Sequence, residues 1–87
     1  MKKVIFDYNA FEDFNEWLKI DKKIHKKIID LIKEIQRNSF VGLGKPEPLK
    51  NDLSGYWSRR ITEEHRLVYK VNDNEIIIIS CKYHYDK

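Results

Sequence analysis

Three residues in the second half of the chain have side chains that can together cleave RNA. Glu47 is a candidate general base, Arg66 is a permanent cation, and His84 is a candidate general acid. Cleavage through the 2′-hydroxyl without a metal needs a base for the 2′-OH proton, a cation for charge growing on the phosphorane, and an acid for the departing 5′-oxygen. Arginine suits phosphate because its guanidinium donates paired hydrogen bonds. Histidine suits the acid because its unperturbed pKa is about 6.5, close to neutral pH. Tyr85, beside His84, can orient the phosphate or stack on a base.

Basic residues lie near this trio in the sequence. Candidates for holding the RNA backbone are Lys45, Lys50, Arg59, Arg60 and Lys82. A second basic group falls on a predicted helix and comprises Lys22, Lys23, Lys26, Lys27 and Lys33. A charged helix face is by default a solvated surface, so a role for it depends on the partner. No spacing typical of metal-ligating His and Cys residues occurs, so we expect neither metal nor cofactor.

Each candidate also has an ordinary structural interpretation. A loop glutamate such as Glu47 is usually surface charge, and Arg66 has Glu63 and Glu64 near it for a surface ion pair. We expect His25 to be solvated on its helix, and His65 to be a turn residue that is near enough to Arg66 to touch RNA. In a chain this small the aromatic residues should be core residues rather than stacking platforms: Phe11, Phe14, Trp17, Tyr56, Trp57 and Tyr69.

Length and composition limit the fold and the compartment. The 87 residues are enough for one domain, residues 1–87, with a thin core. The single Cys81 excludes an intramolecular disulfide, and we expect it to be buried in a strand rather than nucleophilic. Because the chain lacks an apolar signal segment and a membrane-length apolar run, we expect a cytoplasmic protein without a membrane contact. The net charge of +3 is compatible with a polyanionic partner but does not identify one.

The first half of the chain has helical periodicity. A short apolar segment, Val4 to Phe6, is a candidate strand, and Asn9 with Glu12 three residues later predicts a capped helix that ends near Ile20. Asp21 is the predicted N-cap of a second helix. This second helix carries an apolar stripe with the spacing of one helix face: Ile24, Ile28, Leu31, Ile32 and Ile35.

The second half has the period of strands. Glycines and prolines predict a loop over 39–54, and β-branched and aromatic residues predict strands over 56–61, 66–71 and 75–83. These strands would form an antiparallel meander, with the isoleucines of 76–79 in a central strand. The expected class is α+β, with an N-terminal strand and two helices packed on an antiparallel sheet. If the last hairpin is centred on Asp73, Arg66 lies opposite Ser80 and faces the same way as His84.

Three stretches, GKPEPLK, SGYWSRRITEEHRLVY and CKYHY, closely resemble the YoeB toxins, a branch of the RelE superfamily of bacterial mRNA interferases. The likeness continues through the helical runs VIFDYNAFEDFNEWLK and DKKIHKKIIDLIKEIQRNSF. It implies a RelE-like, microbial-RNase-like fold and a toxin of a type II toxin–antitoxin system that cuts mRNA in the ribosomal A site. In the resembling family, Glu47 corresponds to the base, Arg66 to the phosphate-stabilising arginine, His84 to the acid, and Tyr85 to its neighbour.

The resemblance also implies partners. These are mRNA, the 70S ribosome with its rRNA, and a cognate YefM/Phd-like antitoxin, while a homodimer is left open. The ribosome would give the lysine-rich helix a use. Family members commonly stop at or just after the His-Tyr pair, whereas Asp86 and Lys87 follow it here, and Asp86 could either pair with His84 or crowd the site. Two alternatives stay open: a catalytically silent RNA- or antitoxin-binding module, and a ParE-like toxin that inhibits DNA gyrase on the same fold.

Overall fold

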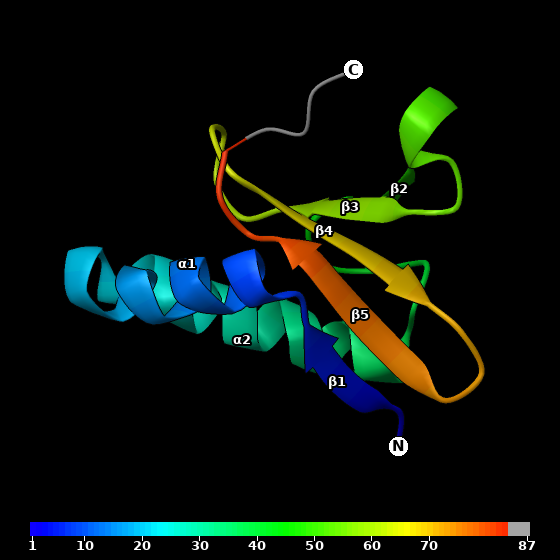
Figure 1. Ribbon diagram of the computed structural model, residues 1–87, viewed down its shortest axis with the longest axis horizontal. Helices are drawn as coiled ribbons and strands as arrows, with labels where there is room; N and C mark the ends of the chain where they lie inside the picture. Colours follow the sequence, from blue (N-terminus) through cyan, green and yellow to red (C-terminus); the bar gives the residue numbers. More distant parts are fainter. Residues whose placement is uncertain (84–87) are drawn as a thin grey trace.

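The computed structural model describes residues 1–83, so the predicted His84 and Tyr85 lie outside the described residues. One mixed sheet with the strand order β1-β5-β4-β3-β2 carries both long helices on one face (Figure 1). The elements in chain order are β1 (Lys3–Phe6), α1 (Tyr8–Ile20), α2 (Lys22–Arg37), β2 (Glu47–Pro48), the 3-10 helix η1 (Asn51–Leu53), β3 (Trp57–Arg60), β4 (Arg66–Val71) and β5 (Glu75–Ser80). The predicted α+β class is confirmed. The predicted loop 39–54 differs in that it contains β2 and η1.

The two helices meet at Asp21, which ends α1 and caps α2. Its carboxylate accepts hydrogen bonds from the backbone N–H groups of Lys23 and Ile24, at 3.0 and 3.4 Å, so the predicted cap is confirmed. The predicted cap of α1 is wrong. Helix α1 begins at Tyr8 after Asp7, which places Asn9 inside the first turn. Asp7 acts through its backbone carbonyl rather than its side chain, so no capping-box pattern marks this helix start.

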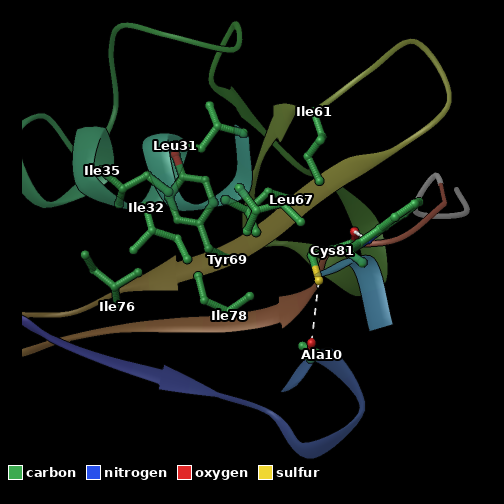
Figure 2. Close-up of a cluster of buried hydrophobic side chains, with 12 residues drawn as sticks. Ala10, Leu31, Ile32, Ile35, Ile61, Leu67, Tyr69, Ile76, Ile78 and Cys81 are labelled. Carbon is green, nitrogen blue, oxygen red and sulfur yellow. Dashed lines mark hydrogen bonds between the residues drawn. The ribbon is translucent and has the colours of Figure 1, made fainter. Parts of the chain in front are cut away.

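The core lies between the helices and the sheet. Ile28, Leu31 and Ile35 of α2 are fully buried, as their stripe predicts. They pack with residues of β4 and β5 and with Ala10 and Trp17 of α1 (Figure 2). The sheet residues of this cluster are Leu67, Tyr69, Ile76 and Ile78, which alternate along their strands with residues of the opposite face. The other face of β3 and β4 is therefore turned away from the helices.

Two of the expected surface and core assignments are wrong. His25 is not simply solvated, because its ring stacks on Phe14 with centroids 4.4 Å apart. Phe11 is not a core residue, since 47% of it remains exposed. Trp17 and Tyr69 are buried as expected, and Phe14 and Trp57 pack against the core while partly exposed.

The sheet is mixed rather than antiparallel. Strands β3, β4 and β5 form the predicted meander, but β1 pairs parallel to β5, with Lys3 opposite Glu75 and Phe6 opposite Ile78. Parallel strands cannot be joined by a tight turn, and here both helices and the strands β2, β3 and β4 lie between β1 and β5 in sequence. Strand β5 thus has neighbours on both edges, in agreement with its run of isoleucines.

The predicted register of the last hairpin is also wrong. Val71 pairs with Ile76, and a bulge between Val68 and Tyr69 then places Ser80 opposite Val68 rather than opposite Arg66. Regular pairing ends there, and the backbone N–H of Arg66 instead donates to the carbonyl of Tyr83, at 3.1 Å. A bulge adds one residue to one strand, so it cannot be read from hairpin symmetry.

Candidate functional site: the face of the sheet opposite the helices

The face of the sheet that is turned away from the helices carries Glu47. On β2 this residue lies directly opposite Ser58 of β3, which lies opposite Val68 of β4, which in turn lies opposite Ser80 of β5. Residues that are directly opposite one another share a face of the sheet, so these four form one row. Glu47 is exposed, and within residues 1–83 its carboxylate has no hydrogen-bond or ion-pair partner.

Arg66 and Arg60 form the next row on the same face. Arg60 of β3 lies opposite Arg66 of β4, two residues along each strand from the Ser58–Val68 pair. Arg66 is half-buried, and its Nη1 donates to the backbone carbonyls of Thr62, Glu63 and His65 at 2.7 to 3.2 Å. Like charges directly opposite one another destabilise a sheet, and an anion bound between these two guanidinium groups would relieve the repulsion.

Glu47 and Arg66 are close enough to act on one ligand. They are separated by two strand spacings of about 4.8 Å and by two residues of about 3.4 Å along the strand, which puts their Cα atoms about 12 Å apart. Both side chains are long and rise from the same face. The structure therefore places a carboxylate and a guanidinium on the same face of the sheet, on either side of β3, whose Ser58 between them is buried.

Arg59, expected to bind RNA, is instead a fully buried structural residue. Its Nε donates to the Tyr69 hydroxyl at 3.1 Å, and its Nη1 donates to the Leu43 carbonyl at 2.9 Å. Its Nη2 donates to the carbonyls of Asn38 and Val41, at 2.5 and 3.0 Å. Alternation along β3 turns Arg59 towards the core when Arg60 faces out. The side chain ties down the loop between α2 and β2 and is not available to a ligand.

The remaining basic candidates differ in their surroundings. Lys45, Lys50 and Arg60 are exposed, and the Arg60 N–H donates to the Gly44 carbonyl at 2.7 Å, which brings the start of the Lys45 segment against the end of β3. Lys82 is partly buried, with its Nζ 5.8 Å from the Trp17 ring centroid and 5.4 Å from that of Tyr83. Lys82 is thus held over aromatic rings rather than beside Glu47.

His65 is more than the turn residue that its sequence position suggests. It is only 7% exposed, and its Nδ1 accepts a hydrogen bond from the backbone N–H of Tyr83 at 2.7 Å. Its ring meets the ring of Trp17 edge-on, with centroids 4.8 Å apart. The sequence pattern offers no sign of these contacts, because they join a turn, helix α1 and the segment that follows β5.

The lysines of α2 lie on the helix side that is turned away from the apolar stripe. Lys22, Lys23 and Lys26 are exposed and Lys27 is partly buried, while Lys26 pairs with Asp30 at 3.1 Å. Cys81 is fully buried, as expected, and its Sγ donates to the Ala10 carbonyl at 3.5 Å (Figure 2). Burial raises the pKa of this thiol to about 12, and the nearby Asp13 carboxylate adds to the rise.

Two observations on the described part of the chain bear on metal sites and membranes. Among residues 1–83, no three His, Cys, Asp or Glu side chains gather closely enough to hold a metal ion. The helices of the same residues are all too short or too polar to cross a membrane.

Comparison with known proteins identifies the family. The model of the YoeB-like toxins of bacterial type II toxin–antitoxin systems matches residues 6–85. Toxin RelK of Mycobacterium tuberculosis is 55% identical over 85 residues, which are 98% of this chain and 100% of the relative. Toxin YoeB of Escherichia coli K12 is 55% identical over 83 residues, which are 95% and 99% of the two chains.

Solved structures agree with this result. The YoeB dimer from Staphylococcus aureus has a TM-score of 0.91 and 55% identity, covering 97% of this chain and 98% of that one. The YoeB–YefM complex from the same organism has a TM-score of 0.89 and 53% identity, covering 98% and 99%. Escherichia coli YafQ, at 17% identity and a TM-score of 0.80, shares the fold. The resemblance in the sequence motifs is therefore confirmed, and the chain belongs to the YoeB-like toxins of bacterial type II toxin–antitoxin systems.

Proposed function

We propose that this toxin is a ribosome-dependent endoribonuclease that cuts mRNA in the ribosomal A site by metal-independent acid–base chemistry. The observation that carries the proposal is that Glu47 and Arg66 lie on the same face of the sheet, the one turned away from the helices, two strands apart. A ribose bound over β3 would offer its 2′-OH to Glu47 and its 3′-phosphate to Arg66. Membership of a toxin family whose members stop translation supports this assignment.

Each residue has one chemical role in this mechanism. Glu47 takes the 2′-OH proton as the oxygen attacks phosphorus, and Arg66 stabilises the negative charge that develops on the phosphorane. His84 then protonates the departing 5′-oxygen, and Tyr85 orients the phosphate. The products are a 2′,3′-cyclic phosphate and a 5′-hydroxyl. Arg60, opposite Arg66, and the exposed Lys45 and Lys50 hold the RNA backbone.

Dependence on the ribosome follows from how little surface is left to align the RNA. Holding reactants in a near-attack geometry is worth about 7 to 11 kcal/mol, and a small domain with a net charge of +3 offers few groups to do so. In this proposal the ribosome holds the mRNA in line and the exposed lysines of α2 contact rRNA. In this proposal a YefM-like antitoxin neutralises the toxin by covering the face that carries Arg60 and Arg66; the relative from Staphylococcus aureus has been solved as a YoeB–YefM complex.

The test is primer extension on mRNA in a purified translation system, with single-turnover rates for Glu47→Ala, Arg66→Ala and His84→Gln. Removal of a general acid or base costs about 10² to 10⁴ in rate, and removal of an electrostatic stabiliser about 10² to 10³. Ribosome binding should survive in all three variants. Glu16→Ala and Arg37→Ala, which remove exposed charges on the helices, are the matched controls and should cut like the wild type.

Four outcomes would contradict the proposal. Full activity of His84→Gln at neutral pH would exclude it as the acid. Loss of ribosome binding as the sole defect of Arg66→Ala would make that residue a contact for binding rather than for chemistry. Products with 5′-phosphate ends would point to water as the nucleophile. If the wild type left mRNA intact but inhibited DNA gyrase, the ParE-like alternative would replace the proposal.

A further inference from the structure

We propose that His65 is a positioning residue of the site: its imidazole, together with the backbone of Arg66, holds Tyr83, the residue that precedes the proposed acid His84 in the sequence. This inference rests on the proposed function only for the role of His84. The clamp itself consists of contacts among described residues. It joins the turn before β4, helix α1 and the segment that follows β5.

Two hydrogen bonds in opposite directions form the clamp. The Tyr83 N–H donates to Nδ1 of His65 at 2.7 Å, and the Arg66 N–H donates to the Tyr83 carbonyl at 3.1 Å. On one side of the clamp, the acceptor and the donor belong to the adjacent residues His65 and Arg66. On the other side, both groups belong to Tyr83. The pair therefore fixes both the position and the orientation of the Tyr83 peptide units relative to Arg66.

The backbone at this point needs a side-chain acceptor. Strand β5 ends at Ser80, so the Tyr83 N–H lies beyond the regular ladder. Tyr83 also has a φ of 62°, a left-handed conformation that a bulky residue adopts only where its surroundings impose it. A neighbouring strand carbonyl would suit an extended residue, whereas the imidazole nitrogen of His65 reaches the N–H in this turned geometry.

The imidazole is held in one orientation. Because Nδ1 accepts the Tyr83 hydrogen bond, the ring proton of the neutral imidazole is on Nε2, which lies 3.6 Å from a carboxylate oxygen of Glu64. The ring packs edge-on against Trp17 and lies 5.5 Å from the Tyr83 ring. With His65 only 7% exposed, it has little freedom to turn away.

The neighbouring residues of the segment are held as well. The Trp17 Nε1–H donates to the Cys81 carbonyl at 3.0 Å, and the Lys82 ammonium lies over both the Trp17 and the Tyr83 rings. Trp17 thus contacts the segment directly and also supports the His65 ring. Since His65 and Arg66 are adjacent, the clamp sets the position of Tyr83, the residue before the proposed acid in the sequence, relative to the arginine proposed to bind phosphate. A displacement of about 1 Å in such a site can cost about 10²-fold in rate.

Two substitutions separate the hydrogen bond from the packing. His65→Phe keeps an aromatic ring against Trp17 and removes the acceptor. His65→Asn removes the ring, but its Oδ1 is attached to Cγ as Nδ1 is and can accept from the Tyr83 N–H. The matched control is His25→Phe, at a histidine whose ring also packs on an aromatic ring, but on that of Phe14 rather than on those of Trp17 and Tyr83.

Two measurements are made on each variant: amide hydrogen exchange at Tyr83, and the single-turnover cleavage rate on programmed ribosomes at saturating toxin. We expect His65→Phe to speed exchange at Tyr83 and to lower the cleavage rate by about 100-fold. We expect His65→Asn to retain more of the protection from exchange at Tyr83 and more of the cleavage rate than His65→Phe does. We expect His25→Phe to change neither the exchange nor the rate. In the His84→Gln background, His65→Phe should have little further effect, because it acts through His84.

The outcomes distinguish this inference from the proposed function. Unchanged Tyr83 exchange in His65→Phe would overturn the clamp. Faster exchange with an undiminished cleavage rate, or equal rate losses in the His84→Gln and wild-type backgrounds, would overturn the positioning role. If the wild type did not cleave at all, the proposed function would fail, while exchange at Tyr83 would still decide whether His65 holds the segment.

Discussion

Replacing the buried arginine at position 59 with methionine should destabilise the protein more than any surface substitution. Methionine keeps most of the side-chain length and fills the core, but it removes every donor. The groups left behind are the Tyr69 hydroxyl and the backbone carbonyls of Asn38, Val41 and Leu43. The perturbation therefore tests whether the loop between α2 and β2 depends on one guanidinium.

The expected loss of stability in Arg59→Met follows from opposing contributions to the free energy of unfolding. Four hydrogen bonds from a charged donor contribute about 1.5 to 3 kcal/mol each, but burying a guanidinium costs several kcal/mol in lost hydration. Each acceptor that stays buried without its donor costs about 1 to 3 kcal/mol, so a net loss of stability of about 3 to 5 kcal/mol is expected. Part of the loop is half-exposed, so water can reach some of the freed carbonyls, and we expect the lower end of that range.

Urea unfolding followed by fluorescence of the two tryptophans measures the effect. With an m-value of about 1 kcal/mol/M, the midpoint should fall by about 3 M. The matched control is Arg60→Met, one residue along β3 and exposed, for which a change within about 0.5 kcal/mol is expected. A destabilisation below about 1 kcal/mol for Arg59→Met, or equal destabilisation by both substitutions, would refute the role of Arg59.

The other predictions concern the thiol and the lysine face. Cys81 should resist alkylation in the folded protein at pH 8 and react in urea, because burial raises its pKa from 9.0 to about 12; equal rates would contradict this. Since the folded state retains the proton, the contribution of this thiol to stability is complete below the ordinary thiol range and diminishes as the pH rises towards 12. Charge reversal of the α2 face should weaken ribosome association and reduce the slope of log K against log salt by about 1 for each rRNA phosphate that is no longer neutralised. The substituted residues are Lys22, Lys23, Lys26 and Lys27. Unchanged ribosome binding at moderate salt would show that this face of α2 is an ordinary solvated surface.

The sequence predicted those elements whose signal is local. The stripe of α2 and the cap at Asp21 needed only the helix period and one side chain, and strand β4 has the predicted bounds of Arg66 to Val71. The start of α1 was missed because the side chain of Asp7 makes no cap hydrogen bond, so no capping pattern marks this helix start. Parallel pairing of β1 with β5 and the bulge beside Val68 depend on contacts between distant segments, which no local pattern encodes.

For the candidate site, too, the sequence predicted some features and missed others. Glu47 and Arg66 were chosen for their chemistry and motif context, and the sheet register puts them on one face. The hairpin register from which Arg66 and His84 were expected to face the same way was wrong. Arg59 and Arg60 are adjacent and of the same residue type, so the residue types alone do not tell them apart. Only the direction of alternation on β3 decides which of the two is buried. His65 was undervalued because its partners, Trp17 and Tyr83, are far from it in the chain.

The place of β5 in the sheet has a consequence for biosynthesis. Among the described strands β5 comes last in sequence, so it leaves the ribosome after the others, yet it lies between β1 and β4, and Lys3 pairs with Glu75. Until residues 75–78 have emerged, the first strand has no neighbour and the helices cannot close over a complete sheet. The sheet therefore completes only after β5 has been made. A nascent chain that lacks β5 cannot yet present the complete fold to the ribosome that makes it.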